Sequence, residues 1–245
     1  MDSGYYAAMT GLVARTQALD LVASNLANAQ TPGYRAEREF FRSVLLGPGA
    51  ADSQLGRTVN DYGLVGGDRL NLVQGTIQQT GNSLDVAIEG EGFFVIQTAN
   101  GLRYTRDGSF RRATDGRLVT ARGEAVLSST NQLIQIPPGE VSIGAGGDLS
   151  VAGGTVARLA VVTFPQDTQL KAEGADRYVA PQGTVASASK NASVRQGALE
   201  GANQDTIQGT LDLIVMQRQA EMMQKALTVF HTDFNKFATE DLPRV

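Results

Sequence analysis

The stretch SNLANAQTPGY, residues 24–34, carries two asparagines one helical turn apart, Asn25 and Asn28, and no charged side chain. It begins within an amphipathic pattern of helical spacing and ends in a turn of Thr31, Pro32, Gly33 and Tyr34. A residue before proline avoids the α region, and glycine accepts positive φ. The stretch therefore predicts the end of a first helix and a turn that leads the chain into another kind of structure.

A four-three alternation of apolar and small residues precedes this turn and predicts a helix from about Gly4 to Asn28. That spacing is typical of the seam of a coiled coil. The seam residues are Tyr5, Met9, Leu12, Thr16, Leu19, Ala23 and Leu26. The opposite side carries small residues and amides with few charges. We therefore expect neighbouring helices to approach this helix on more than one side.

A second long helix is predicted from about Asp205 to Thr239. Its four-three seam consists of Leu213, Met216, Ala220, Met223, Leu227, Phe230, Phe234 and Phe237. A second apolar line runs beside the seam through Leu211, Val215, Met222, Ala226 and Val229. Two apolar lines suit a helix that packs between several others. We expect the two terminal helices to pair as a coiled coil.

Short β-prone runs fill the middle of the chain. Leu84–Thr98 predicts two short strands around a Gly-Glu-Gly turn, and Asp107-Gly108 and Asp115-Gly116 are hairpin signals. The predicted fold class is α+β, with a β-rich central domain, a meander or an irregular barrel, and long terminal helices. The expected domains are a terminal-helix assembly domain (1–35 and 203–245), an extended connector (36–80 and 170–202) and a β-rich outer domain (81–169).

Residues that could carry catalysis are scarce. His231 is the single histidine and there is no cysteine. Asp107 and Asp115 precede glycine in apparent turns, which explains them more simply than a metal site does. A net charge of −4 argues against a nucleic-acid partner, and no stretch approaches the ~20 apolar residues of a membrane span. We expect no catalytic, metal or cofactor site and no direct membrane insertion.

The terminal helices carry more apolar surface than one partner helix covers. This favours a subunit that packs against copies of itself, because an interface that repeats head to tail without closing gives a helical filament. An ordinary intramolecular helix pair that caps a β domain is the alternative. The amides of Asn25 and Asn28 would bond either to a neighbouring subunit or back to their own chain.

The segment LVASNLANAQTPGYRAEREFF, residues 21–41, resembles the N-terminal signature of the flagellar rod and hook protein family. Its pattern is Asn-Leu-Ala-Asn followed by Thr-Pro-Gly and an aromatic residue. The central segments NSLDVAIEGEGFFVI, YTRDGSF and DGRLVTARG agree, and so does VRQGALEGANQD at residues 194–205. These matches follow the family's order and cover most of the chain.

The resemblance implies a non-catalytic structural subunit of the bacterial flagellar basal-body rod, which crosses the periplasm. It implies export by the flagellar type III export apparatus without a cleaved signal peptide. It also implies polymerisation, through the terminal helices, with copies of itself and other rod proteins into the axial drive shaft.

The segment after Phe41, RSVLLGPGAADSQLG, lacks the Tyr-Gln-rich insertion of the distal-rod type, so the resemblance favours the proximal-rod type. A distal-rod subunit is one alternative. A secreted β-domain that binds glycans is another, although aromatic residues make up only 6% of the chain and several lie in the terminal helices.

Overall fold

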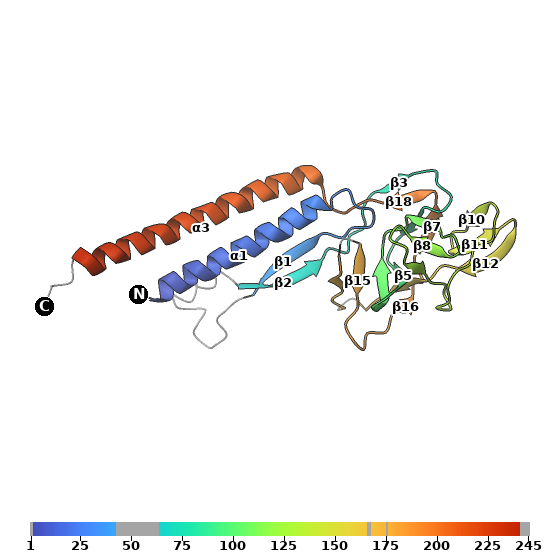
Figure 1. The fold of residues 1–245 in the computed structure, drawn as a ribbon, viewed down its shortest axis with the longest axis horizontal. Helices are drawn as coiled ribbons and strands as arrows, with labels where there is room; N and C mark the ends of the chain where they lie inside the picture. The colour runs from blue at the N-terminus through green and yellow to red at the C-terminus, as the bar shows by residue number, and fades with distance from the viewer. Residues whose placement is uncertain (1, 43–63, 166–167, 175, 241–245) are drawn as a thin grey trace. The chain divides into compact units, whose positions relative to one another are not determined.

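A computed structural model describes residues 2–42, 64–165, 168–174 and 176–240 (Figure 1). The chain forms two compact units. Unit 1 consists of Met1–Leu26, Glu37–Asp68 and Thr206–Val245, and unit 2 consists of Ala27–Ala36 and Arg69–Asp205. The chain thus passes from unit 1 into unit 2 at residue 27, returns at residue 37, and changes unit again near residues 69 and 206.

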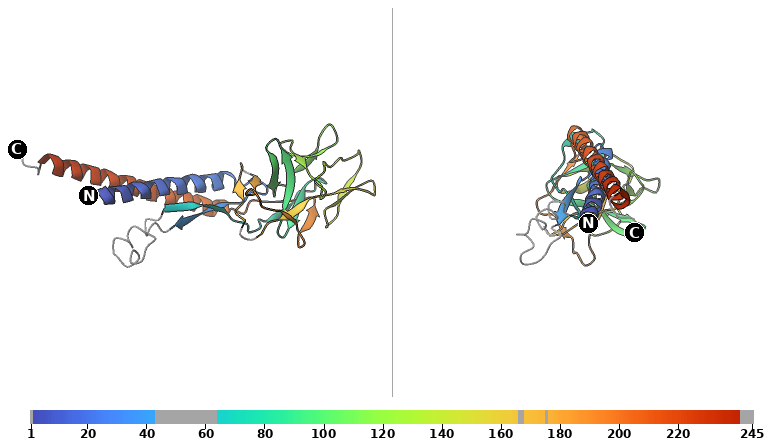
Figure 2. Two further views of the ribbon diagram at one scale, coloured as in Figure 1. Left: turned by 90° about the horizontal axis from the view of Figure 1, so that it is seen from below. Right: turned by 90° about the vertical axis from the view of Figure 1, so that its left-hand side faces the viewer.

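Unit 1 contains two long helices and one pair of strands. Helix α1 spans Asp2–Ala27 and helix α3 spans Thr206–Glu240, close to the predicted spans. Strands β1 (Glu37–Arg42) and β2 (Leu64–Leu70) pair with each other. The views in Figures 1 and 2 show each helix as one continuous rod. The prediction of long terminal helices is therefore confirmed.

Unit 2 is built from short strands, and in its described residues these strands pair with one another in antiparallel fashion. The strands are β3 (Ile77–Gln79), β4 (Val86–Glu89), β5 (Phe93–Thr98), β6 (Gly101–Thr105), β7 (Phe110–Arg112), β8 (Leu118–Thr120), β9 (Ala125–Val126), β10 (Val141–Ile143), β11 (Asp148–Val151), β12 (Gly154–Arg158), β13 (Val161–Thr163), β14 (Lys171–Ala172), β15 (Arg177–Val179), β16 (Ser187–Ala188), β17 (Ser193–Gln196) and β18 (Ala198–Glu200).

The largest sheet of unit 2 is open. It has nine strands, with the main path β14-β15-β6-β5-β9-β8-β7 and with β13 and β16 attached beside β5. The ends of this path, β14 and β7, do not pair in the described residues, so the sheet does not close and the expectation of a barrel is wrong. β4 and β5, on either side of the Gly90–Gly92 turn, belong to different sheets, because β4 pairs with β17.

The two Asp-Gly pairs have different roles. Asp115-Gly116 joins β7 to β8 as a hairpin, with Gly116 at φ +86°, which confirms that prediction. Asp107-Gly108 joins β6 to β7, which do not pair, so the hairpin prediction there is wrong. A Cβ at Gly108 would lie 1.7 Å from the carbonyl oxygen of Val86. Glycine is required there for a close backbone approach.

The core of unit 2 lies between these sheets. Its main cluster contains Val86, Ile88, Phe94, Ile96, Phe110, Leu118, Val126, Ile134, Ile136, Ile143, Leu149, Val151, Leu159 and Val194. A smaller cluster of Phe93, Leu170 and Tyr178 lies beside it. The Phe93 and Tyr178 rings meet edge to face, with centroids 5.6 Å apart. This second cluster supports the junction described below.

Candidate assembly helices and their junction

Helix α1 buries a narrow line of small residues. The buried residues on this line are Gly11, Ala14, Ala18 and Asn25. Because each residue turns a helix by about 100°, the predicted seam lies about a third of a turn away. Its leucines, Leu12, Leu19 and Leu26, are half-buried, and Met9 is 40% exposed. The chain therefore covers the small-residue face and leaves the seam partly open.

The two asparagines of the opening stretch bond back to the chain. Asn25 donates from Nδ2 to the carbonyl oxygen of Glu37 (2.8 Å) and accepts at Oδ1 from the Glu37 amide (2.9 Å). The carbonyl oxygen of Asn28 accepts from the Thr31 amide (3.0 Å), and its Oδ1 accepts from the Thr31 hydroxyl (3.4 Å). Asn25 thus ties α1 to the start of β1, and Asn28 shapes the turn that follows the helix.

Helix α3 is exposed along most of its described length. The predicted seam residues Leu213, Met216, Met223 and Leu227 are half-buried, and Ala220 between them is buried. Most of the second apolar line is open, with Leu211, Val215, Met222 and Val229 between 49% and 62% exposed, whereas Ala226 is half-buried. The side chains of Tyr5, Phe230, Phe234 and Phe237, also predicted for the seams, lie outside the described residues. Ile207 and Ile214 are exposed as well, so large apolar side chains are exposed along much of the described part of α3.

The turn after α1 is docked on unit 2. The Gly33 amide donates to the carbonyl oxygen of Glu200 (2.7 Å), and the Arg35 amide donates to the Tyr178 hydroxyl (2.9 Å). Gly33 has φ +71°, and a Cβ there would lie 2.2 Å from the amide nitrogen of Asp107. Tyr34 is 4% exposed. Glycine is therefore required at the point where this segment meets the β core.

A buried charge cluster lies beneath this turn. Arg35 Nη2 is 2.6 Å from Glu200 Oε1, and Arg106 Nη1 is 3.0 Å from Glu200 Oε2. The Arg35 and Glu200 side chains are both 0% exposed. The Arg35 guanidinium makes no hydrogen bond of good geometry to a described residue, so we regard its contact with Glu200 as an ion pair without a directed bond. The cluster holds two positive charges and one negative charge.

The surroundings of the cluster partly compensate its burial. Burial lowers the pKa of Arg106, and the neighbouring Glu200 carboxylate opposes that shift. The Arg106 guanidinium donates to the carbonyl oxygen of Gly90 (2.7 Å) and lies 5.4 Å from the centroid of the Phe93 ring. Burial also raises the pKa of Tyr178, whose hydroxyl donates to the carbonyl oxygen of Gly33 (3.3 Å).

Asn203 completes the junction on the C-terminal side. Its Oδ1 accepts from the Ala36 amide (2.7 Å), and its Nδ2 donates to the carbonyl oxygens of Asn71 (2.6 Å) and Val73 (2.8 Å). Three chain segments, residues 31–36, 71–76 and 200–203, are thereby joined. The sequence analysis missed Arg35, Arg106, Glu200 and Asn203. Arg35, Arg106 and Glu200 are charged residues inside three of the segments that carry the family resemblance, and this placement was the available signal.

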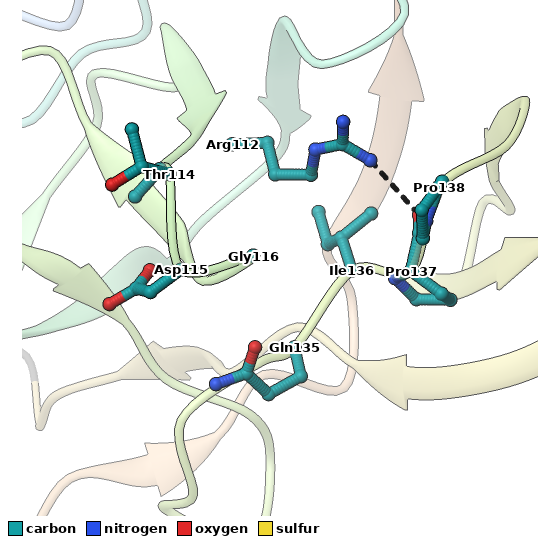
Figure 3. Close-up of a pocket in the computed structure, with 9 residues that line it drawn as sticks. Arg112, Thr114, Asp115, Gly116, Gln135, Ile136, Pro137 and Pro138 are labelled. Carbon is teal, nitrogen blue, oxygen red and sulfur yellow. Dashed lines mark hydrogen bonds between the residues drawn. The ribbon is translucent and has the colours of Figure 1, made fainter.

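Unit 2 also carries one open hollow of about 660 Å³, beside the β7–β8 turn and residues 135–138 (Figure 3). Arg112 reaches across it and donates to the carbonyl oxygen of Pro137 (3.3 Å). The carboxylate residue in the lining of the hollow, Asp115, is paired with Arg117 (2.5 Å). The lining holds no histidine, cysteine or second carboxylate. It therefore lacks the pair of titratable groups that acid–base catalysis at this hollow would use.

Two kinds of site are absent from the described residues. No group of three or more His, Cys, Asp or Glu side chains could hold a metal ion. Neither described helix is long and apolar enough to cross a membrane.

Comparison with known proteins identifies the family. Residues 6–35 match the family model described as "Flagella basal body rod protein", and residues 87–151 match "Flagellar hook protein FlgE/F/G D1 domain". The chain is 33% identical to the flagellar basal-body rod protein FlgF of Caulobacter vibrioides, over 93% of each chain.

Two other relatives agree with this match. The chain is 32% identical to the flagellar basal-body rod protein FlgG of Agrobacterium fabrum, over 90% of this chain and 92% of the relative. It is 31% identical to the flagellar basal-body rod protein FlgF of Salmonella typhimurium, over 93% and 94%. Since these relatives are matched over nine-tenths or more of their length, the chain belongs to the family of flagellar basal-body rod proteins.

Proposed function

We propose that this chain is a non-catalytic structural subunit of the flagellar basal-body rod that polymerises through its terminal helices. The observation that carries the proposal is the exposure of both helices. Four of the five residues on the second apolar line of α3 are about half exposed or more, and the seam leucines of α1 are only half-buried. Apolar helix faces of this length are stabilised mostly by tertiary packing, and copies of the same chain supply matching faces.

The helices of neighbouring subunits, in this proposal, meet along the two seams as a coiled coil. The partners are copies of this chain and other rod proteins, and the subunit reaches its place through the flagellar type III export apparatus without a cleaved signal peptide. Its site is the rod where it crosses the periplasm. The turn at Thr31–Tyr34 leads the chain from the assembly helices to the β unit.

The more specific assignment within the family is the proximal-rod type, which is the FlgF type. It rests on the absence of a Tyr-Gln-rich insertion in RSVLLGPGAADSQLG, which lies mostly outside the described residues. Relatives of the FlgG type match almost as well as those of the FlgF type, so the distal-rod subunit is the second candidate. Expression in two strains, one lacking its FlgF protein and one lacking its FlgG protein, separates the two. A proximal-rod subunit restores swimming only in the first.

Substitution of Leu26 by aspartate tests assembly through the seam. A carboxylate placed between packed helices is buried without a partner, so we expect rods to exclude L26D, and likewise L227D, while unit 2 stays folded. Gln17→Asp is the matched control, because Gln17 is exposed on the opposite side of α1. Basal bodies purified from a strain that expresses only the variant give the measurement. Normal incorporation of L26D would show that the seam is assigned wrongly.

A further inference from the structure

Glu200 joins parts of unit 2 that are far apart in the sequence. Its carboxylate contacts Arg35, which follows the turn after α1, and Arg106, which follows β6. Its Oε1 also accepts from the Gly75 amide (2.9 Å), and its carbonyl oxygen accepts from the Gly33 amide (2.7 Å). One residue at the end of β18 therefore holds both segment 31–36 and segment 71–76.

The balance of charge makes this carboxylate indispensable to the two arginines. Two guanidinium groups and one carboxylate leave a net charge of +1 in a cluster whose side chains are at most 4% exposed. Loss of the carboxylate would leave two buried positive charges facing each other, and removal of one partner from a buried pair is strongly destabilising. Arg106 is further anchored by the carbonyl oxygens of Ile88 and Gly90, whereas Arg35 makes no such bond to a described residue.

We propose that Glu200 is a positioning residue for assembly, which holds segment 31–36 on unit 2 and so fixes where the chain from α1 joins this unit. The same residue stands three positions before Asn203, where the chain leaves toward α3. The inference rests on the proposed function, because a subunit that assembles through its ends needs both connections at defined places. No residue of segment 31–36 belongs to the main hydrophobic core cluster, so we expect the core to persist when the segment is released.

Packing of Tyr34 and Ala36, which are 4% and 3% exposed, is the rival explanation for the docked segment. The net charge of the cluster separates the two explanations. It is +1 in the natural chain, +2 in E200Q, 0 in R35Q and +1 in the double variant R35Q/E200Q. If charge holds the segment, E200Q releases it most, and adding R35Q to E200Q partly restores it. If packing holds the segment, the double variant is no better than E200Q.

Amide hydrogen exchange of the full-length chain measures the release. The reporters are the amides of Gly33, Arg35 and Ala36, and the core reference is the amide of Val86, which donates to the carbonyl oxygen of Gly108. In E200Q we expect exchange at the reporters to rise about 100-fold or more while the reference stays protected. Glu89→Gln is the matched control, because Glu89 pairs with Arg195 at the surface of the neighbouring strands and is 46% exposed.

Three results would overturn the proposal: unchanged reporter exchange in E200Q, an equal rise in E89Q, or no restoration in the double variant. If E200Q unfolds all of unit 2, R35Q becomes the test variant. Reporter amides that exchange as slowly in R35Q as in the natural chain would then overturn the proposal. Incorporation of the folded variant into rods is the second readout, and we expect it to fall with reporter protection. Failure of the natural chain to support rod assembly would instead refute the proposed function, and the exchange data would be unaffected.

Discussion

Substitution of Gly33 by alanine tests whether the turn after α1 is docked as tightly as the structure indicates. Gly33 has φ +71°, which costs an alanine about 1–2 kcal/mol. The added Cβ would also lie 2.2 Å from the amide nitrogen of Asp107 and 2.4 Å from the carbonyl carbon of Arg106. Both atoms belong to the backbone, which cannot rotate away, and overpacking of this kind costs about 1–3 kcal/mol.

Gly81 provides a matched control for this substitution. Its φ is +76°, and a Cβ there would meet nothing within 4 Å. Gly81→Ala therefore carries the backbone cost without the overlap. We expect the free energy of unfolding to fall by about 1–2 kcal/mol in G81A and about 2–5 kcal/mol in G33A. For a unit of this size, each kcal/mol lowers the melting temperature by about 2–4 °C.

Thermal unfolding of the full-length chain, followed by circular dichroism in the strand region, provides the assay. If the strain in G33A exceeds the strength of docking, segment 31–36 detaches instead. It then loses the hydrogen bonds from the Gly33, Arg35 and Ala36 amides, about 1 kcal/mol each. Either course makes G33A the less stable variant. Equal melting temperatures for G33A and G81A would refute the close approach at Gly33.

Three further outcomes follow from the buried polar groups. Tyr178→Phe removes the acceptor of the Arg35 amide and should cost about 1–3 kcal/mol in urea unfolding, with a normal slope. Burial raises the pKa of Tyr178, so the folded chain keeps the hydroxyl proton at a pH where the unfolded chain loses it. The free energy of unfolding therefore falls as pH rises above about 10, and this fall should be smaller in Y178F. Asn25→Ala should expose the Glu37 amide to faster hydrogen exchange, whereas Gln17→Ala should not.

The two helices and the turn after the first helix could be predicted because their signals are local. The four-three spacing and Thr31-Pro32-Gly33 place the end of the first helix within a residue of its observed end at Ala27. Asp115-Gly116 could be read for the same reason, since the turn and its two strands are adjacent in sequence. Asp107-Gly108 shows the limit: the dipeptide is the same, but the contact that requires Gly108 is with Val86, more than twenty positions away.

The charge cluster could not be predicted from spacing. Arg35, Arg106 and Glu200 lie on three segments that only the completed fold brings together, and each is an ordinary charged residue in its local context. Likewise, the pattern of α1 indicated the leucine seam, yet the face that the chain buries most completely carries Gly11, Ala14 and Ala18. Sequence periodicity finds an apolar face, but it does not show which face of a helix the rest of the chain covers.

The bond between Ala36 and Asn203 closes a loop across 167 positions, so it has a consequence for the kinetics of folding. Contacts between distant positions form late, since the chain must first lose the entropy of closing the intervening loop. Unit 2 therefore completes its N-terminal edge only when residues 198–203 have become available. Refolding should show an early phase in β5–β9, whose pairings with one another are local, and a slower phase at segment 31–36. A chain that ends before residue 198 should show only the first phase.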